Sequence, residues 1–233
     1  MRGFRGEWIA WGLYVLMLYL VVEFASRSLK IGELDGDVVW ITWQEFVERH
    51  LGDLMETNAT MDFPVRPPLA EGVQIARPFG NEGHLGEDWN VAPGNEDLGE
   101  PVYSPGDGWV SLAMDFEGAW GKVVTVIYKV EEQGRVHYVE MMFAHLDAIY
   151  VEPFTLIPRG KLIGVMGNCG GLYAAHLHWE VRTELGLGLG GGYGEEDMLK
   201  SYRSGSGFIS ALRKEEGRYR FLAMEDWEMW GSD

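Results

Sequence analysis

Downstream of a proline-rich segment, short apolar runs alternate with glycine-rich turns up to about residue 183. The runs are rich in Val, Tyr and Trp, which are typical of strands, and they lie at residues 102–104, 108–113, 123–128, 136–143, 162–165 and 176–181. Turns are predicted between them at residues 104–108, 117–118, 133–134 and 167–171. Several short strands at this spacing predict a mainly β fold, built on an antiparallel sheet or sandwich.

One segment upstream of the predicted strands has the spacing of a helix. Residues 42–57 begin with Thr42 and Glu45, which form an S/T-x-x-E capping box. Four apolar residues of this segment could line one helix face: Trp43, Phe46, Leu51 and Leu54. We therefore predict a short helix here, followed by a proline-rich extended connector at residues 63–68. A second short helix is predicted at residues 208–214.

The N-terminus begins with basic residues and continues into an apolar run. The run covers residues 8–22 and is extended past Glu23 to residue 25. It is shorter than the ~20 residues of a full membrane span, and the basic start is typical of an export signal. We predict an uncleaved inner-membrane anchor at residues 8–25 or a cleaved signal peptide, with a buried N-terminal helix as the alternative. Either export route places the remaining chain in the cell envelope, periplasmic or extracellular.

Two segments beyond the predicted sheet have an unusual composition. Residues 186–194 are too rich in glycine for the interior of an element and predict a mobile loop, which either borders a substrate groove or is a plain linker. Residues 225–230 are acidic and aromatic, and we predict that they dock onto the domain, with partner binding as the alternative. The predicted organisation is a signal peptide or anchor at 1–30, a helical and proline-rich connector at 31–70, a β domain at 71–185 and a C-terminal extension at 186–233.

The composition narrows the class of protein. Hydrophobic residues make up 46% of the chain and charged residues 24%, which predicts a folded domain and not a disordered one. The formal net charge is -17, and no basic stripe interrupts it, which argues against nucleic-acid binding. The chain has one cysteine, Cys169, so an internal disulfide and a zinc site built from several thiolates are both excluded. A metal would have to be held by His, Asp or Glu.

Four of the six histidines fall in three informative places. His84 and Asp88 are four residues apart, so both can face one ion. His145 follows a predicted strand, and His176 and His178 are two apart on another, where they share a face. An isolated H-x-H is explained equally well by two surface histidines. A set of His and Asp ligands, however, suits catalytic zinc, which has three protein ligands and an open position for water.

These segments resemble the LytM/lysostaphin family of zinc metallopeptidases, which cut peptide bonds in bacterial peptidoglycan. The family pattern is H-x-x-x-D, then a histidine in A-H-L, then H-L-H-[FW]-E, and it recurs here at residues 84–88, 144–146 and 176–180. Turns at residues 101–108, 159–164 and 167–170 also resemble those of the family, although Cys169 replaces its usual Thr or Ser. The resemblance covers about residues 74–182, roughly half of the chain.

The resemblance implies a role for each residue of the pattern. His84, Asp88 and His178 would bind Zn²⁺, and His145 and His176 would act as the catalytic pair on the substrate peptide. It also implies a zinc-dependent endopeptidase whose partner is a peptidoglycan peptide, with residues 71–185 as the zinc peptidase domain. Glu180, on the same strand face as the H-x-H pair, could orient a histidine or be purely structural.

Two other functions compete with this interpretation. A non-catalytic peptidoglycan-binding or activator module could use the same fold, but such a module would be expected to lose one or more of the five positions. A biotinyl or lipoyl carrier domain has a related β architecture, but it needs an exposed lysine in an M-K-M or D-K-A motif. Neither motif occurs in this sequence.

Overall fold

The computed structural model describes residues 28–34 and 37–213. The predicted anchor or signal peptide and the acidic aromatic tail therefore lie outside the described residues. Within the described part of the chain, no helix is long and apolar enough to cross a membrane.

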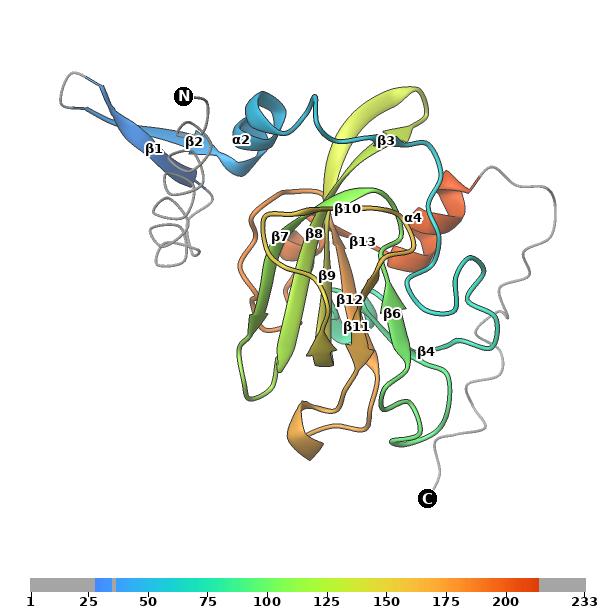
Figure 1. Cartoon of the computed structure of the whole chain (residues 1–233). Coiled ribbons are helices and arrows are strands. Elements are labelled where there is room, and N and C mark those ends of the chain that lie inside the picture. The colour runs from blue at the N-terminus through green and yellow to red at the C-terminus, as the bar shows by residue number, and fades with distance from the viewer. Residues whose placement is uncertain (1–27, 35–36, 214–233) are drawn as a thin grey trace, which may run out of the picture.

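The centre of the fold is a sheet of 11 strands among the described residues, which confirms the predicted mainly β, antiparallel architecture. All six predicted strands belong to it: β6 (Pro101–Tyr103), β7 (Gly108–Asp115), β8 (Lys122–Glu132), β9 (Arg135–Ile149), β11 (Leu162–Met166) and β12 (Leu177–Arg182). Figure 1 shows β7, β8, β9 and β12 side by side, and successive members of this series pair antiparallel.

Several strands have no counterpart in the prediction. The sheet continues beyond β12 through β5 (Glu87–Asn90) to β4 (Gln74–Arg77), and it also contains β3 (Thr57–Asn58), β10 (Leu156–Ile157) and β13 (Tyr202–Arg203). A separate hairpin pairs β1 (Ser28–Leu34) with β2 (Asp37–Thr42). These segments are short or rich in polar residues, so the alternation of apolar and polar positions that marks a half-buried strand is weak in them.

The predicted N-terminal helix exists but is shorter than expected. Helix α2 (Trp43–His50) begins at Thr42 with both hydrogen bonds of the capping box, as predicted. The expected end near residue 57 is wrong, because the chain turns after His50, and Leu54 is 63% exposed and not part of a buried stripe. Val47 takes the buried place instead.

The remaining helices are short. A helix is found where the C-terminal one is predicted, but α4 (Gly205–Leu212) begins three residues before the expected start at residue 208, and α3 (Glu196–Leu199) precedes it. Two 3₁₀ turns lie in loops: η1 (Asn81–Gly83) precedes β5, and η2 (Cys169–Gly171) precedes β12.

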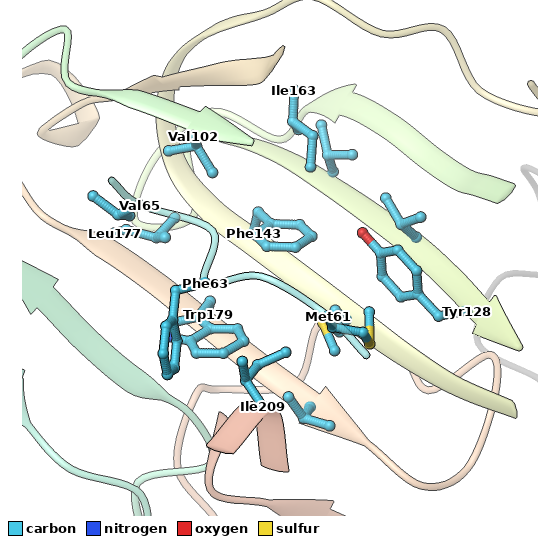
Figure 2. Packing of buried hydrophobic residues seen from close by; sticks show 14 of the residues in the cluster. Met61, Phe63, Val65, Val102, Tyr128, Phe143, Ile163, Leu177, Trp179 and Ile209 are labelled. Carbon is cyan, nitrogen blue, oxygen red and sulfur yellow. The ribbon is translucent and has the colours of Figure 1, made fainter. Parts of the chain in front are cut away.

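In the hydrophobic core, the sheet packs against segments that precede and follow its main strands in the sequence. Figure 2 shows Met61, Phe63 and Val65 of the connector, Trp179 of β12 and Ile209 of α4 in one cluster. Trp179 is fully buried, and its ring packs edge-to-face on Trp89 at 5.1 Å between ring centroids. The domain boundaries near residues 71 and 185 remain predictions, and the core contains residues from both sides of them.

Strand β12 is buried on both faces, and this positions the functional site. Its apolar face lies in the core, whereas its polar face carries His178, Glu180 and Arg182. Alternation alone would predict that the polar face is open to solvent. It is covered instead, because Gly86 lets the backbone pass closely over it: a Cβ at Gly86 would lie 2.6 Å from the Trp179 carbonyl oxygen and 3.0 Å from His178 Cε1.

Candidate metal centre

Three segments that are distant in the sequence bring His84, Asp88 and His178 together. His84 ends the 3₁₀ turn η1, Asp88 lies on β5 and His178 lies on β12. The register of the β5–β12 pair places Asp88 opposite His178. Opposite residues in an antiparallel pair project from the same face of the sheet, so the two side chains meet.

The polar atoms of these three residues converge on one point. His178 Nδ1 lies 2.9 Å from Asp88 Oδ1 and 3.1 Å from His84 Nε2, and His84 Nε2 lies 3.3 Å from Asp88 Oδ1. All three atoms fall within 4.8 Å of one another. Two imidazole nitrogens and one carboxylate oxygen form the mixed donor set that zinc accepts in catalytic sites. The residues therefore fit a zinc ion by the chemistry of their donor atoms.

The site keeps Asp88 ionised at neutral pH. Burial opposes the charge of this carboxylate, but hydrogen bonds with His178 and His84 hold the pKa of Asp88 well below its usual range. Burial likewise opposes a charge on His178, yet hydrogen bonds with Asp88 and Glu180 raise the pKa of His178 to about 9. A metal ion binding through Nδ1 would take the place of a proton on this ring.

A buried network of charged side chains contacts His178 through Nε2, the ring nitrogen that does not face Asp88. His178 Nε2 lies 3.1 Å from Glu180 Oε1, and Arg182 donates to the other Glu180 oxygen at 2.7 Å. Arg182 also donates to Glu140 at 3.1 Å, and the Gly186 backbone N–H donates to Glu140 at 3.0 Å. Metal-ligating histidines are commonly oriented by a carboxylate on the second ring nitrogen. The contact between Glu180 and His178 has this arrangement.

The pKa values of the two carboxyl groups in this network shift in opposite directions. Burial raises the pKa of Glu140. Burial also disfavours the charge on Glu180, but Arg182 and His178 outweigh it and lower the pKa of Glu180. Glu180 is therefore an anion that can accept a hydrogen bond from His178.

His145 and His176 lie beside the three converging residues. Their ring centroids are 4.8 Å apart, and His145 lies 5.6 Å from the His178 ring. His176 Nε2 is 3.7 Å from Asp88 Oδ1. All five residues singled out in the sequence thus occupy one place, whereas His50 is exposed on α2 and His137 faces Glu132 on another part of the sheet. The individual roles of the five residues remain predictions.

The hydrogen bonds of the two neighbouring histidines restrict their protonation. His176 Nδ1 lies 2.8 Å from the Ala174 carbonyl oxygen, which can only accept, so the neutral ring carries its proton on Nδ1 and leaves Nε2 unprotonated. Burial lowers the pKa of His145 to about 3, so this ring is neutral at pH 7. His145 Nδ1 lies 3.2 Å from Cys169 Sγ.

The five residues line a cleft of about 550 Å³. Aromatic side chains border it, and three of its lining residues belong to the glycine-rich loop: Gly191, Gly192 and Tyr193. Backbone hydrogen bonds fix this loop to the η1 region, from Leu85 to Gly192 and from Gly194 to Gly83, both at 2.9 Å. The loop therefore borders a groove, which is one of its two predicted roles. Its mobility remains a prediction.

Among the charged and aromatic side chains of the cleft, Arg77, Trp120 and Tyr173 were not identified from the sequence, and Tyr193 was identified only as part of the glycine-rich loop. Trp120 stacks on His145 with 5.9 Å between ring centroids and an interplanar angle of 19°. Tyr173 and Tyr193 line the cleft and are 42% and 44% exposed. No repeating pattern marks these residues, because they lie at strand ends and in loops.

Comparisons with known proteins found similar peptidases. Residues 82–188 match Peptidase family M23. The peptidoglycan DD-endopeptidase ShyB of Vibrio cholerae is 37% identical over 84 residues, which cover 36% of this chain and 18% of the length of that protein. Among solved structures, a zinc containing peptidase from Vibrio cholerae is 30% identical, with 52% of this chain and 36% of the other covered and a TM-score of 0.36.

The catalytic domain of lysostaphin from Staphylococcus simulans is 18% identical, with 65% of this chain and 92% of the other covered and a TM-score of 0.40. The matched residues 82–188 contain all five positions of the motif pattern. The predicted resemblance is therefore confirmed: residues 82–188, a little under half of the chain, match Peptidase family M23.

Proposed function

We propose that this protein is a zinc-dependent endopeptidase that hydrolyses peptide bonds of bacterial peptidoglycan in the cell envelope. The observation that carries the proposal is the convergence of His84 Nε2, Asp88 Oδ1 and His178 Nδ1 within 4.8 Å, on the wall of a cleft in a peptidase-family domain. The substrate class is supported by the relative named as a peptidoglycan DD-endopeptidase. The predicted export segment at residues 8–25 agrees with the location.

In this proposal His84, Asp88 and His178 hold the zinc ion. When bound, zinc supplies Lewis-acid chemistry that activates water and polarises the peptide carbonyl. His176 accepts the proton of the attacking water through Nε2, which is the nitrogen without a proton in the neutral ring and lies close to the metal ligands. His145 stabilises the negative charge that develops on the carbonyl oxygen, which a neutral ring can do by donating from Nε2.

Cys169 is proposed as a positioning residue for His145. The single thiol proton has two acceptors within reach, the Ala119 carbonyl oxygen at 3.3 Å and His145 Nδ1 at 3.2 Å; in this proposal it is donated to Nδ1, which leaves the proton of the neutral ring on Nε2. Cys169→Ala removes this contact and is expected to lower kcat about fivefold, the equivalent of one hydrogen bond of about 1 kcal/mol. Cys169→Ser keeps a hydroxyl donor and should retain most of the activity. Steady-state kinetics on one peptide substrate, with kcat and KM separated, measure both variants.

The result that contradicts this role is an equal kcat for the alanine and serine variants. A loss seen in KM alone would also contradict it, because orientation of a group that acts on the transition state should change kcat.

Digestion of purified peptidoglycan tests the proposed function. The zinc-loaded full chain should release new peptide N-termini, identified by mass spectrometry of the products. Treatment with a chelator should stop the release, and added zinc should restore it. Binding to peptidoglycan without any cleavage would reject the enzyme and support a non-catalytic binding module. Cleavage that is unaffected by complete metal removal would reject the zinc-dependent reaction.

A further inference from the structure

Arg77 is the one lysine or arginine among the described residues that line the cleft. It lies at the end of β4 with an exposed side chain. In the β4–β5 register Arg77 is opposite Asp88, and opposite residues of an antiparallel pair project from the same face. The β4 strand bulges just before Arg77, but the pairing and the shared cleft place a permanent cation in the same cleft as a proposed metal ligand, in a chain whose formal net charge is -17.

Tyr193 connects this guanidinium to the metal centre. Arg77 Nη1 donates to the Tyr193 hydroxyl, and Arg77 Cζ lies 5.7 Å from the centroid of the Tyr193 ring. The same ring lies 5.2 Å from the His84 ring, and a β-bridge pairs the two residues. One aromatic side chain from the glycine-rich loop thus contacts both the cleft cation and a proposed zinc ligand.

The charge of Arg77 is left without a carboxylate partner in the part of the chain that the structure describes. Its polar partner is a neutral phenol, whereas other arginines pair with Asp or Glu: Arg66, Arg159, Arg182 and Arg203. A guanidinium has five N–H donors and binds carboxylates through two parallel hydrogen bonds. Arg77 therefore has donors available for an anionic group that enters the cleft.

We propose that Arg77 binds a carboxylate of the substrate peptide close to the bond that is cut. The inference rests on the proposed peptidase function and adds a substrate class to it, namely peptides with a free carboxylate in preference to neutral ones. An extended peptide advances ~3.3 Å per residue. A group held beside Asp88 therefore belongs to a residue next to the carbonyl at the metal centre, as its side chain or as a nearby C-terminus.

Three matched peptides test this proposal with the zinc-loaded full chain. One carries a free side-chain carboxylate and a free C-terminus, the second has the side chain amidated, and the third has the C-terminus amidated. For the wild type, amidation of the recognised group should raise KM about tenfold, the low end of the range for charge-assisted hydrogen bonds in a partly exposed site. The amidated peptide that shows this increase identifies which carboxylate is bound.

Variants of Arg77 assign the preference to this residue. Arg77→Gln should bring the ratio of KM values close to one, and Arg77→Lys should retain part of it, because an ammonium keeps the charge but not the planar fork. Arg135→Gln is the control. Arg135 is an exposed arginine at the start of β9 and does not line the cleft, so this variant should keep the wild-type ratio.

Binding of the same peptides to His176→Ala, measured by calorimetry, separates this inference from the proposed function. Equal affinity for all three peptides, or discrimination that persists in Arg77→Gln, would overturn the carboxylate site while leaving the peptidase function in place. Tighter binding of the free carboxylate peptide, together with no hydrolysis by the wild type, would support the carboxylate site and overturn the peptidase function.

Discussion

Replacing His178 with alanine is expected to abolish peptide hydrolysis and to remove zinc from the protein. His178 would supply one of three ligand atoms, and even loss of a residue that only orients a ligand typically weakens metal binding about 10–100-fold. We therefore expect zinc affinity to fall by more than about a hundredfold. The Lewis-acid contribution of the metal is several kcal/mol, so the rate should fall by at least about a thousandfold. Peptide hydrolysis and zinc titration with a competing chelator measure the two losses.

His176→Ala is the matched control for this prediction. It removes an imidazole two residues away on the same strand face, but His176 is outside the set of three converging ligand atoms. This variant should lose activity while binding zinc as the wild type does. Zinc loss in both variants, or in neither, would contradict the proposed division between metal ligand and proton acceptor.

Replacing Arg182 with methionine is expected to cause the largest loss of stability. Arg182 is fully buried and pairs with Glu180 at 2.7 Å and Glu140 at 3.1 Å, both of which are also buried. Methionine has a similar volume but leaves two buried carboxylates without their cation. Breaking a buried ion pair by removing one partner typically costs about 3–5 kcal/mol. The free energy of unfolding from urea titration, with both chains zinc-loaded, measures the difference.

Arg203→Met provides the comparison for the buried network. Arg203 forms two hydrogen bonds of 2.8 Å with Glu132, but the Arg203 and Glu132 side chains are 33% and 20% exposed. Solvent screens such a pair, so its loss should cost no more than about 1 kcal/mol. An equal decrease in the free energy of unfolding for the two methionine variants would contradict the larger contribution expected from the buried Arg182 network.

The strands that the sequence predicts contain either an apolar run or, as in β12, apolar residues at alternate positions. β4 and β5 were missed because their stabilising partners are distant in the sequence. Glu87 of β5 is 1% exposed, whereas a carboxylate side chain is almost never fully buried unless it is paired. A glutamate in the sequence therefore does not suggest a buried strand position. Burial of Glu87 is tolerated because Ser204 and Ser206 near the start of α4 donate to it at 2.7 and 2.9 Å, and Trp89 Nε1 donates at 2.9 Å. Sequence patterns among neighbouring residues do not reveal hydrogen bonds between such distant segments.

The helix at residues 43–50 shows a different limit of prediction. The capping box fixed its start correctly, because both hydrogen bonds lie within four residues. Its end depends on tertiary contacts: Gly52 packs so closely that a Cβ there would lie 2.8 Å from the Tyr138 hydroxyl. The apolar residue Leu54 then falls on an exposed turn, although its spacing suggested a buried stripe.

The five residues of the candidate site could be selected from the sequence because their types and spacing match a family pattern. Their meeting in space depends on strand register, such as the opposition of Asp88 and His178, which alternation does not determine. The rest of the cleft could not be selected. Arg77 and Tyr193 become neighbours only when the glycine-rich loop lies against η1.

Zinc content of the purified full chain is the most direct test of the central claim. After exhaustive dialysis against metal-free buffer, elemental analysis should find about one zinc ion per wild-type chain, bound through the N₂O donor set typical of catalytic sites. The variants His84→Ala, Asp88→Ala and His178→Ala should each lose it, while Arg135→Gln should retain it. A wild-type chain without zinc after reconstitution, or full zinc retention in all three ligand variants, would contradict the metal centre.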